Sequence, residues 1–218
     1  MPAGQIDWPS TMIGFVLVVY WGRVLRMSHK ARCAGRNSNL IPPEPLGRAL
    51  RLIWAPVVLF WIAIPFVAAA RGHRERSIWL DSQFVLAPIR WVAVGVAILL
   101  LAGTWMCWKK LGRAWRMGIN PGESTELVVT GPYAIVRHPI YALAMLLAAA
   151  CVVAVPGLAM VLAAGAHALL LYAEARREEQ YLAMQLGPAY ARYCAQVGRF
   201  VPLSKSALKT RAGSGDAD

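Results

Sequence analysis

The chain has 218 residues, of which 58% are hydrophobic and 16% are charged, and its formal net charge is +12. This composition lies outside the range of ordinary soluble domains and indicates an integral membrane protein. Basic residues that flank apolar spans meet anionic lipid headgroups, so the charge is explained by a lipid bilayer and we expect no nucleic acid partner.

Five apolar stretches are each close to the length of a membrane-spanning helix. A helix rises 1.5 Å per residue, so about 20 residues cross about 30 Å of hydrocarbon. The first stretch is the least apolar, but no basic residue precedes it, so we interpret it as a helix and not as a signal segment. The sequence thus predicts an all-α integral membrane protein of about five transmembrane helices, at residues 8–27, 48–70, 84–108, 139–155 and 157–173.

Lys and Arg fall unevenly on the two sides of these spans. Nineteen lie on the side that holds the loops after the first and third spans and the C-terminal segment, whereas four lie on the other side. Loops rich in Lys and Arg stay in the cytoplasm. We therefore expect the N-terminus outside the cell and the C-terminus in the cytoplasm. The four cysteines form no CxxC pair, so we expect neither a disulfide framework nor a metal site.

The last two spans are separated by only Val155-Pro156-Gly157, which predicts a tight antiparallel helical hairpin. Such a hairpin brings the loop 109–138 next to the charged segment 174–200. The helix of the fifth span should continue beyond the membrane and break at Gly187-Pro188, because proline suits the first turn of a new helix. Two distant pieces of sequence would thus form one site.

The first of these pieces contains GPYAIVRHPIY, in which Pro132 and Pro139 constrain the backbone around Arg137 and His138. A ligand beside His138 would meet the positive end of the fourth helix and its free N–H groups, which favours a carboxylate or another electron-rich group. Alternatively, Arg137 and His138 simply lie at the level of the lipid headgroups.

The second piece contains Glu174, Glu178, Glu179 and Tyr181, and the first two carboxylates share one helical face. They could form solvated ion pairs with Arg176 and Arg177, of little energetic value. They could instead face the His138 loop and bind a ligand with hydroxyls and a positive charge, such as a sulfonium that carries an amino group and a ribose. The spacing is compatible with both interpretations.

Two blocks of the sequence, LVVTGPYAIVRHPIY and REEQYLAMQLGPAYARYCAQVGRFVP, resemble the signature blocks of the isoprenylcysteine carboxyl methyltransferase family, which is related to the phospholipid N-methyltransferases. The blocks occur in the family's order and across one helical hairpin. The matching positions are Leu127, Val128, Gly131, Tyr133, Arg137, His138, Pro139 and Tyr141, followed by Glu178, Glu179, Leu182, Gly187, Tyr190 and Tyr193.

This resemblance implies a methyltransferase of bacterial type, in the inner membrane, with S-adenosylmethionine held by a C-terminal cytoplasmic segment. It divides the chain into a three-helix membrane part (1–108), a methyltransferase-like region (109–202) and a disordered tail (203–218). The acceptor would be a lipophilic or small apolar carboxylate, thiol or amine at the cytoplasmic face. The implied cofactor-binding residues are Leu127, Val128, Tyr133, His138, Tyr141, Glu178, Glu179 and Tyr190.

Arg137, His138 and Glu174 are the candidate catalytic residues, with His138 and Glu174 as possible bases for a protonated acceptor. The sequence departs from the family at two positions. Leu143 stands where the family often has glycine, and Glu174 stands where the isoprenylcysteine enzymes have the arginine for the substrate carboxylate. Prenylcysteine is therefore not the expected substrate. Two alternatives stay open, namely an NADPH-dependent membrane reductase of the sterol-reductase type and a non-catalytic membrane protein with the same fold.

Overall fold

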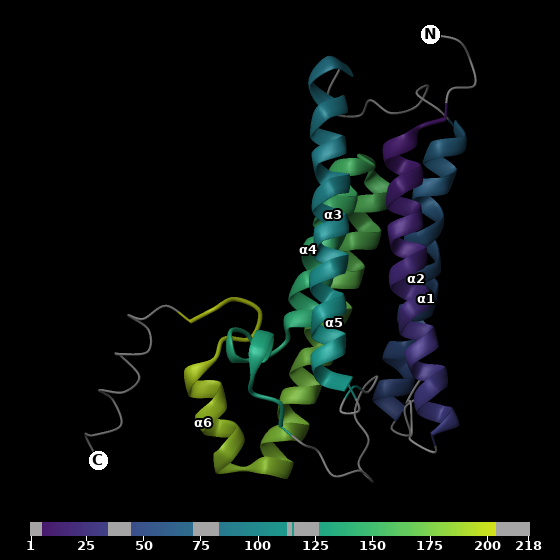
Figure 1. Cartoon of the computed structure of the whole chain (residues 1–218). Helices are drawn as coiled ribbons and strands as arrows, with labels where there is room; N and C mark the ends of the chain where they lie inside the picture. The colour runs from purple at the N-terminus through teal and green to yellow at the C-terminus, as the bar shows by residue number, and fades with distance from the viewer. Residues whose placement is uncertain (1–5, 35–44, 72–82, 113–114, 116–126, 204–218) are drawn as a thin grey trace.

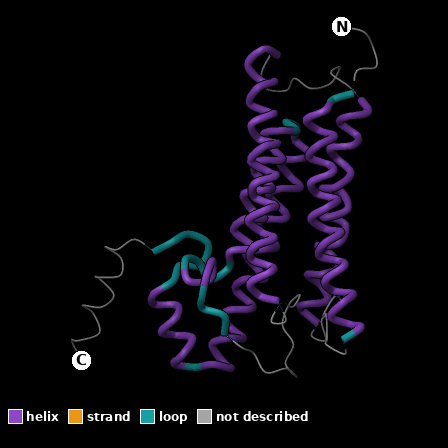
Figure 2. The backbone as a smooth tube through the Cα atoms, in the orientation of Figure 1, coloured by secondary structure: helices purple, strands orange, loops and turns teal. Residues whose placement is uncertain are grey.

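The computed structural model describes residues 6–34, 45–71, 83–112, 115 and 127–203. These residues form helices joined by loops, and no strand occurs among them (Figures 1 and 2). The elements are α1 (Trp8–Cys33), α2 (Pro45–Arg71), α3 (Gln83–Leu111), the 3-10 helix η3 (Gly131–Ala134), α4 (Pro139–Ala154), α5 (Leu158–Leu186) and α6 (Pro188–Gln196). The chain is thus the all-α membrane protein that its composition predicts; the tail from residue 204 onward lies outside the described residues.

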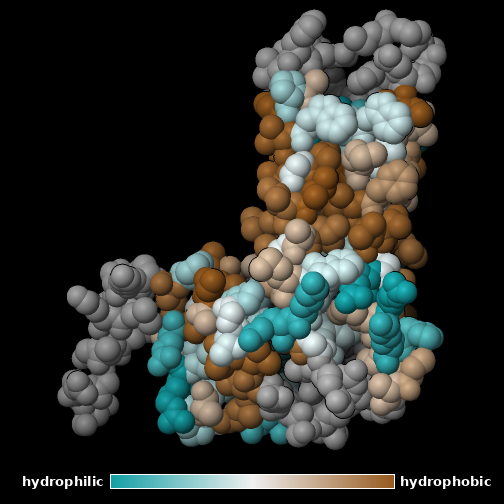
Figure 3. Space-filling view, in the orientation of Figure 1, coloured by the Kyte–Doolittle hydropathy of each residue, from teal (hydrophilic) through white to brown (hydrophobic). Residues whose placement is uncertain are grey.

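Helices α1 to α5 form an upright bundle, and α6 lies beside the lower part of α5 (Figure 1). The C-terminal ends of α1, α3 and α5 and the N-terminal ends of α2 and α4 lie at this lower end. The upper block has a mainly apolar surface, whereas hydrophilic residues gather at the lower end (Figure 3). The segments that the charge count assigns to the cytoplasm therefore lie at one end of the molecule.

Four helices, α1, α2, α3 and α5, are long and apolar enough to cross a membrane. The fourth apolar helix of the chain, α4, has 16 residues and is about 24 Å long at 1.5 Å per residue. It is shorter than the roughly 30 Å of hydrocarbon that a full span covers. The short α4 leaves irregular backbone, residues 127–138, at the lower end of the bundle.

The hairpin predicted at Val155-Pro156-Gly157 is present, because α4 ends at Ala154 and α5 begins at Leu158. Counting outward from Pro156, this places His138 level with Glu174. The part of α5 from residue 158 to 173 carries no Asp, Glu, Lys or Arg, and we treat it as the spanning part; the charged residues follow it. The predicted break is also present: Gly187 has a φ of +50°, and α6 begins at Pro188.

Residues 136–138 pair with residues 198–199, which follow α6. Val136 and Gly198 form an isolated parallel bridge. The Arg137 N–H donates to the Gly198 carbonyl (2.7 Å), and the His138 N–H donates to the Arg199 carbonyl (3.0 Å). Irregular backbone near a membrane is tolerated only where its polar groups are paired. The chain after α6 supplies this pairing for the loop that enters α4.

A buried ion pair ties three helices together at the opposite end of the bundle. The Arg90 guanidinium in α3 contacts the Asp7 carboxylate, which precedes α1, at 2.5 Å. It also donates through Nε to the Ala154 carbonyl (2.6 Å), at the last residue of α4. The exposed fractions of Arg90 and Asp7 are 6% and 2%. A helix leaves its final carbonyls without helical partners, so Arg90 satisfies one of these in α4.

Replacement of one member of this pair should destabilise the bundle. In the variant Arg90→Met the Asp7 carboxylate stays buried without its cation, and the expected loss in the free energy of unfolding is about 3–5 kcal/mol. The double variant Asp7→Leu with Arg90→Met should lose less than the sum of the two single variants. Unfolding of the detergent-purified variants measures both effects. Equal stability of Arg90→Met and the wild type would contradict a buried pair.

Close packing after α6 gives a second prediction. A Cβ atom at Gly198 would lie 1.9 Å from the Val201 carbonyl oxygen, so Gly198→Ala must displace the segment that pairs with residues 136–138. We expect a lower melting temperature and faster hydrogen exchange at the amides of Arg137 and His138. Gly165→Ala in α5 is the matched control, because a Cβ there meets no atom within 4 Å. If both variants exchange alike, the pairing does not fix the loop.

Candidate functional site

His138 is the residue from which α4 starts, and its ring lies between two carboxylates. It is the N-cap of α4, and its side chain makes no capping hydrogen bond. Nδ1 lies 3.5 Å from Glu178 Oε2, and Nε2 lies 3.3 Å from Glu179 Oε1. The second contact is not aligned as a hydrogen bond, since Nε2 has no such partner. The imidazole is therefore oriented by acidic neighbours on α5.

Glu178 is held from α4 as well. The Tyr141 hydroxyl donates to Glu178 Oε1 at 2.7 Å, while Oε2 faces His138. The rings of His138 and Tyr141 are stacked, with centroids 5.4 Å apart and an interplanar angle of 2°. The proximity of His138 and Glu178, which the hairpin predicts, is thus present at the lower end of the bundle.

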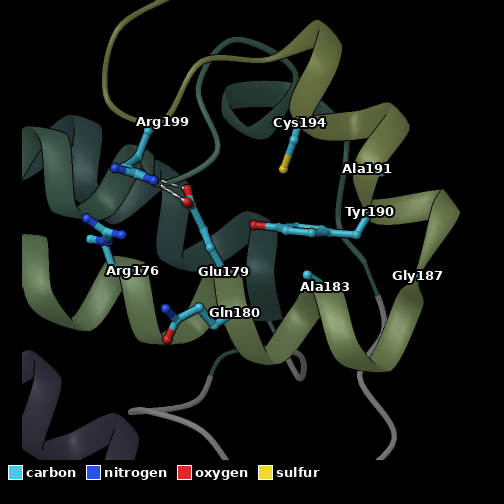
Figure 4. Close-up of a pocket in the computed structure, with 9 residues that line it drawn as sticks. All are labelled: Arg176, Glu179, Gln180, Ala183, Gly187, Tyr190, Ala191, Cys194 and Arg199. Carbon is cyan, nitrogen blue, oxygen red and sulfur yellow. Dashed lines mark hydrogen bonds and ion pairs between the residues drawn. The ribbon is translucent and has the colours of Figure 1, made fainter.

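Glu179 points to another group of partners, which are mainly cationic. Its carboxylate pairs with Arg137 (2.9 Å) and with Arg199 (2.5 Å), the latter contact being drawn in Figure 4. Burial alone raises the pKa of this carboxyl, but the contacts with His138, Arg199 and Arg137 prevail and hold the pKa well below its ordinary value. Conversely, the bond to Glu179 raises the pKa of Arg199. Glu179 is therefore a permanent negative charge at neutral pH.

Arg137 is fully engaged with protein groups. Besides Glu179, its Nη1 donates to the carbonyls of Cys194 (3.2 Å) and Val197 (2.5 Å), near the end of α6. A guanidinium with its donors directed at carboxylate and carbonyl oxygens is fixed in position. This geometry favours a role for Arg137 in joining α5 and α6 to the loop, rather than direct contact with a substrate.

Glu174 lies one helical turn before Glu178, and it is 3% exposed. Oε2 accepts from Arg177 at 2.5 Å, and Oε1 lies 3.9 Å from Arg51 of α2 and has no hydrogen bond. The Arg51 guanidinium also lies over the Trp54 ring, 5.0 Å from its centroid. Glu174 thus pairs with Arg177, but the pair is largely buried and not the solvated pair of the first interpretation. Its Oε1 is still able to accept a hydrogen bond.

The remaining predicted residues lie around the loop before α4 and around α6. Tyr133 is 8% exposed, and burial raises the pKa of its hydroxyl, with smaller contributions from the nearby Cys107 and Glu178. Leu127 packs against the buried cluster of Tyr190, Tyr193 and Val197, and Val128 is half-buried. Tyr190 lies on α6.

Tyr193 of the same helix holds the loop in place. Its hydroxyl donates to the Tyr133 carbonyl at 2.5 Å. Burial raises the pKa of Tyr193 to about 12, so the hydroxyl stays protonated and able to donate at neutral pH. The position of Tyr133 therefore depends on α6.

Several buried polar atoms at this end of the bundle have no hydrogen-bond partner among the described residues. Buried polar groups are normally paired, so a group of orphan atoms calls for an explanation such as a ligand or ordered water. They are the Tyr133 hydroxyl, His138 Nε2, Glu174 Oε1 and Arg51 Nε. Together with Glu178 they offer both donors and acceptors to a polar ligand.

Arg51 and Arg199 belong to this arrangement, although the sequence does not single them out. Arg199 lies within the second signature block, so its place after the tyrosines of that block was an available signal. Arg51 is far from α5 in the sequence and looks like an ordinary basic residue at the start of the second span. Only the packing of α2 against α5 brings it to Glu174.

Comparison with known proteins gives two matches. Residues 92–184 match the model of the isoprenylcysteine carboxyl methyltransferase (ICMT) family. The matched segment includes His138, Glu178 and Glu179 and ends before α6. The chain is also 32% identical over 104 residues to the nickel-cobalt-cadmium resistance protein NccN of Alcaligenes xylosoxydans xylosoxydans. That alignment covers 45% of this chain and 41% of NccN. The match agrees with the family predicted from the two sequence blocks: residues 92–184 of this membrane protein, less than half of the chain, carry the isoprenylcysteine carboxyl methyltransferase match.

Proposed function

We propose that the protein is an S-adenosylmethionine-dependent methyltransferase that acts on a lipophilic acceptor at the cytoplasmic membrane face. The family match indicates a membrane methyltransferase, and methyltransferases of this family use S-adenosylmethionine. The acceptor would be a carboxylate, a thiol or an amine attached to an apolar group. The excess of Lys and Arg at the lower end of the bundle supports the assignment of that end to the cytoplasm.

One observation carries the proposal, namely the meeting of the two signature blocks around His138 and Glu178. His138 Nδ1 and Glu178 Oε2 are 3.5 Å apart, although the residues are separated by a complete helical hairpin. An imidazole, a carboxylate and the Tyr141 hydroxyl converge where the spanning helices end. Such convergence of polar groups beside an apolar bundle is typical of a small-molecule site.

The residues present fit the cofactor. S-adenosylmethionine, when bound, supplies an electrophilic methyl group on a sulfonium that also carries an amino group, a carboxylate and ribose hydroxyls. Glu178 would hold its positive end, and the orphan hydroxyl of Tyr133 could bond to an oxygen or nitrogen of the ligand. The backbone of Leu127 and Val128 would complete the shell. Glu179 would support it through its contact with His138, and Tyr190 would act only indirectly, through the packing of α6.

The protein's own groups would then mainly align the acceptor and exclude water. His138 can accept a proton from a protonated acceptor, because its ring is oriented by Glu178 and Tyr141. Glu174 is a second candidate base through Oε1, which has no hydrogen bond among the described residues. An apolar acceptor would enter sideways from the bilayer, where large apolar side chains of α1, α2 and α5 are exposed.

Binding of the cofactor tests the proposal most directly. Isothermal titration of detergent-purified protein with S-adenosylmethionine and with its demethylated product should give saturable binding. In Glu178→Gln the shape is kept and the charge is lost, so affinity should fall by about 10- to 100-fold, as expected for a hydrogen bond to a charged group. Gln185→Ala, an exposed residue of α5, is the control and should bind like the wild type.

The outcomes separate the site from the enzyme class. Cofactor binding that survives Glu178→Gln unchanged would contradict the assignment of Glu178 but not the class. Binding of NADPH in place of S-adenosylmethionine would instead favour a membrane reductase. Absence of binding to either compound would favour a non-catalytic protein with this fold.

A further inference from the structure

A cavity lies on the side of Glu179 that faces α6. It has a volume of about 310 Å³ and lies between the charged part of α5 and helix α6. Figure 4 shows Arg176 and Arg199 together at one side of it, with Tyr190 reaching across from α6. The polar side chains that line it are Arg176, Glu179, Gln180, Tyr190, Cys194 and Arg199. The pairing of His138 with Glu178 belongs to a different face of α5.

The charge around this cavity is positive. Among the described residues that line the cavity, Glu179 carries the negative charge, and Arg137 and Arg199 already neutralise its carboxylate. Arg176, an exposed residue of α5, adds a further positive charge to the rim. A ligand that enters beside Arg176 and Arg199 therefore meets an excess of cationic groups, which favours an anion.

Tyr190 supplies an independent sign of a ligand. Its side chain is 3% exposed, and its hydroxyl has no hydrogen-bond partner among the described residues. In Figure 4 this hydroxyl points into the cavity, toward Glu179. Because a buried hydroxyl without a partner is costly, a bound group with an acceptor oxygen would stabilise it.

The cavity lies at the depth of the lipid headgroups. Arg176 is three residues beyond Ala173, or about 4.5 Å along the helix, and the headgroup layer is about 5–7 Å thick on each side of the hydrocarbon. Arg199 lies over the Tyr172 ring, 5.5 Å from its centroid, and Phe200 packs beside the same ring. Tyr172 and Val201 are 42% and 69% exposed. This mixture of basic, aromatic and apolar side chains is typical of a membrane interface.

We propose that this cavity binds the phosphate of an anionic glycerophospholipid of the inner leaflet, such as phosphatidylglycerol. Arg176 and Arg199 would pair with the phosphate, the Tyr190 hydroxyl would donate to the headgroup, and the acyl chains would lie along Tyr172 and Val201. The lipid is not the methyl acceptor, and the proposal does not depend on methyl transfer. Since Arg199 also holds Glu179, the lipid would brace α6 against α5.

Native mass spectrometry of the full chain in detergent can test this proposal with three probes: phosphatidylglycerol, phosphatidylcholine and inorganic phosphate. We expect phosphatidylglycerol to bind best. Arg176→Gln should weaken its binding by about tenfold or more, because a charged hydrogen bond is lost, and Tyr190→Phe by about two- to tenfold. Arg192→Gln removes an equal charge from an exposed position of α6 outside the cavity. This matched control should bind like the wild type.

Several results would overturn the lipid site. Equal binding of phosphatidylcholine and phosphatidylglycerol would exclude recognition of an anionic headgroup. Equal loss in Arg176→Gln and Arg192→Gln would show that only the overall charge matters. Inorganic phosphate that binds as well as the lipid would identify free phosphate as the occupant. A loss of S-adenosylmethionine affinity in Arg176→Gln, measured by titration at unchanged melting temperature, would assign the cavity to the cofactor.

Discussion

The arrangement at the lower end of the bundle depends on one partly buried carboxylate, Glu179. It pairs with Arg137 from the loop before α4 and with Arg199 from the segment after α6, and it contacts His138. A buried charge is tolerated only when it is paired and hydrogen-bonded, so all three partners must be in place together. Glu179 therefore fixes three distant parts of the chain at one point. Glu178, the residue before it on α5, is thereby held beside His138.

The length of α4 determines where this site can lie. A full span would carry its N-terminus out of the hydrocarbon, but α4 has 16 residues and starts directly after His138. The backbone before it must then satisfy its polar groups near the membrane edge, which the bridge to Gly198 achieves. The shortened helix thus places a paired polar loop beside apolar helices. Under the proposed function, a site at this position would receive a charged cofactor from the cytoplasm and an apolar molecule from the bilayer.

The sequence predicts the helices, the hairpin and the position of His138 beside Glu178, because these follow from hydropathy, proline and glycine positions, and helical register. It does not predict that Arg137 donates hydrogen bonds to Glu179 and to a carbonyl of α6. The partners of a long side chain depend on tertiary packing, which the local sequence does not show. The same holds for Arg51, which reaches Glu174 only because α2 packs against α5. Local pattern therefore identified the residue types, whereas packing decided which charges compensate each other.

The charges around Glu174 bear on which acceptor the proposed methyltransferase could admit. A glutamate one turn before Glu178 would repel a second carboxylate if it stood alone. Arg177 binds it at 2.5 Å, however, and Arg51 lies 3.9 Å away with its Nε still unpaired. Two arginines thus balance the two glutamates, and Arg51 is the less tightly bound of the two. An anionic acceptor would require Arg51 to turn from Glu174, whereas a neutral acceptor would require no such change. Under the proposed function, the geometry at rest therefore favours an uncharged thiol or amine as the methyl acceptor.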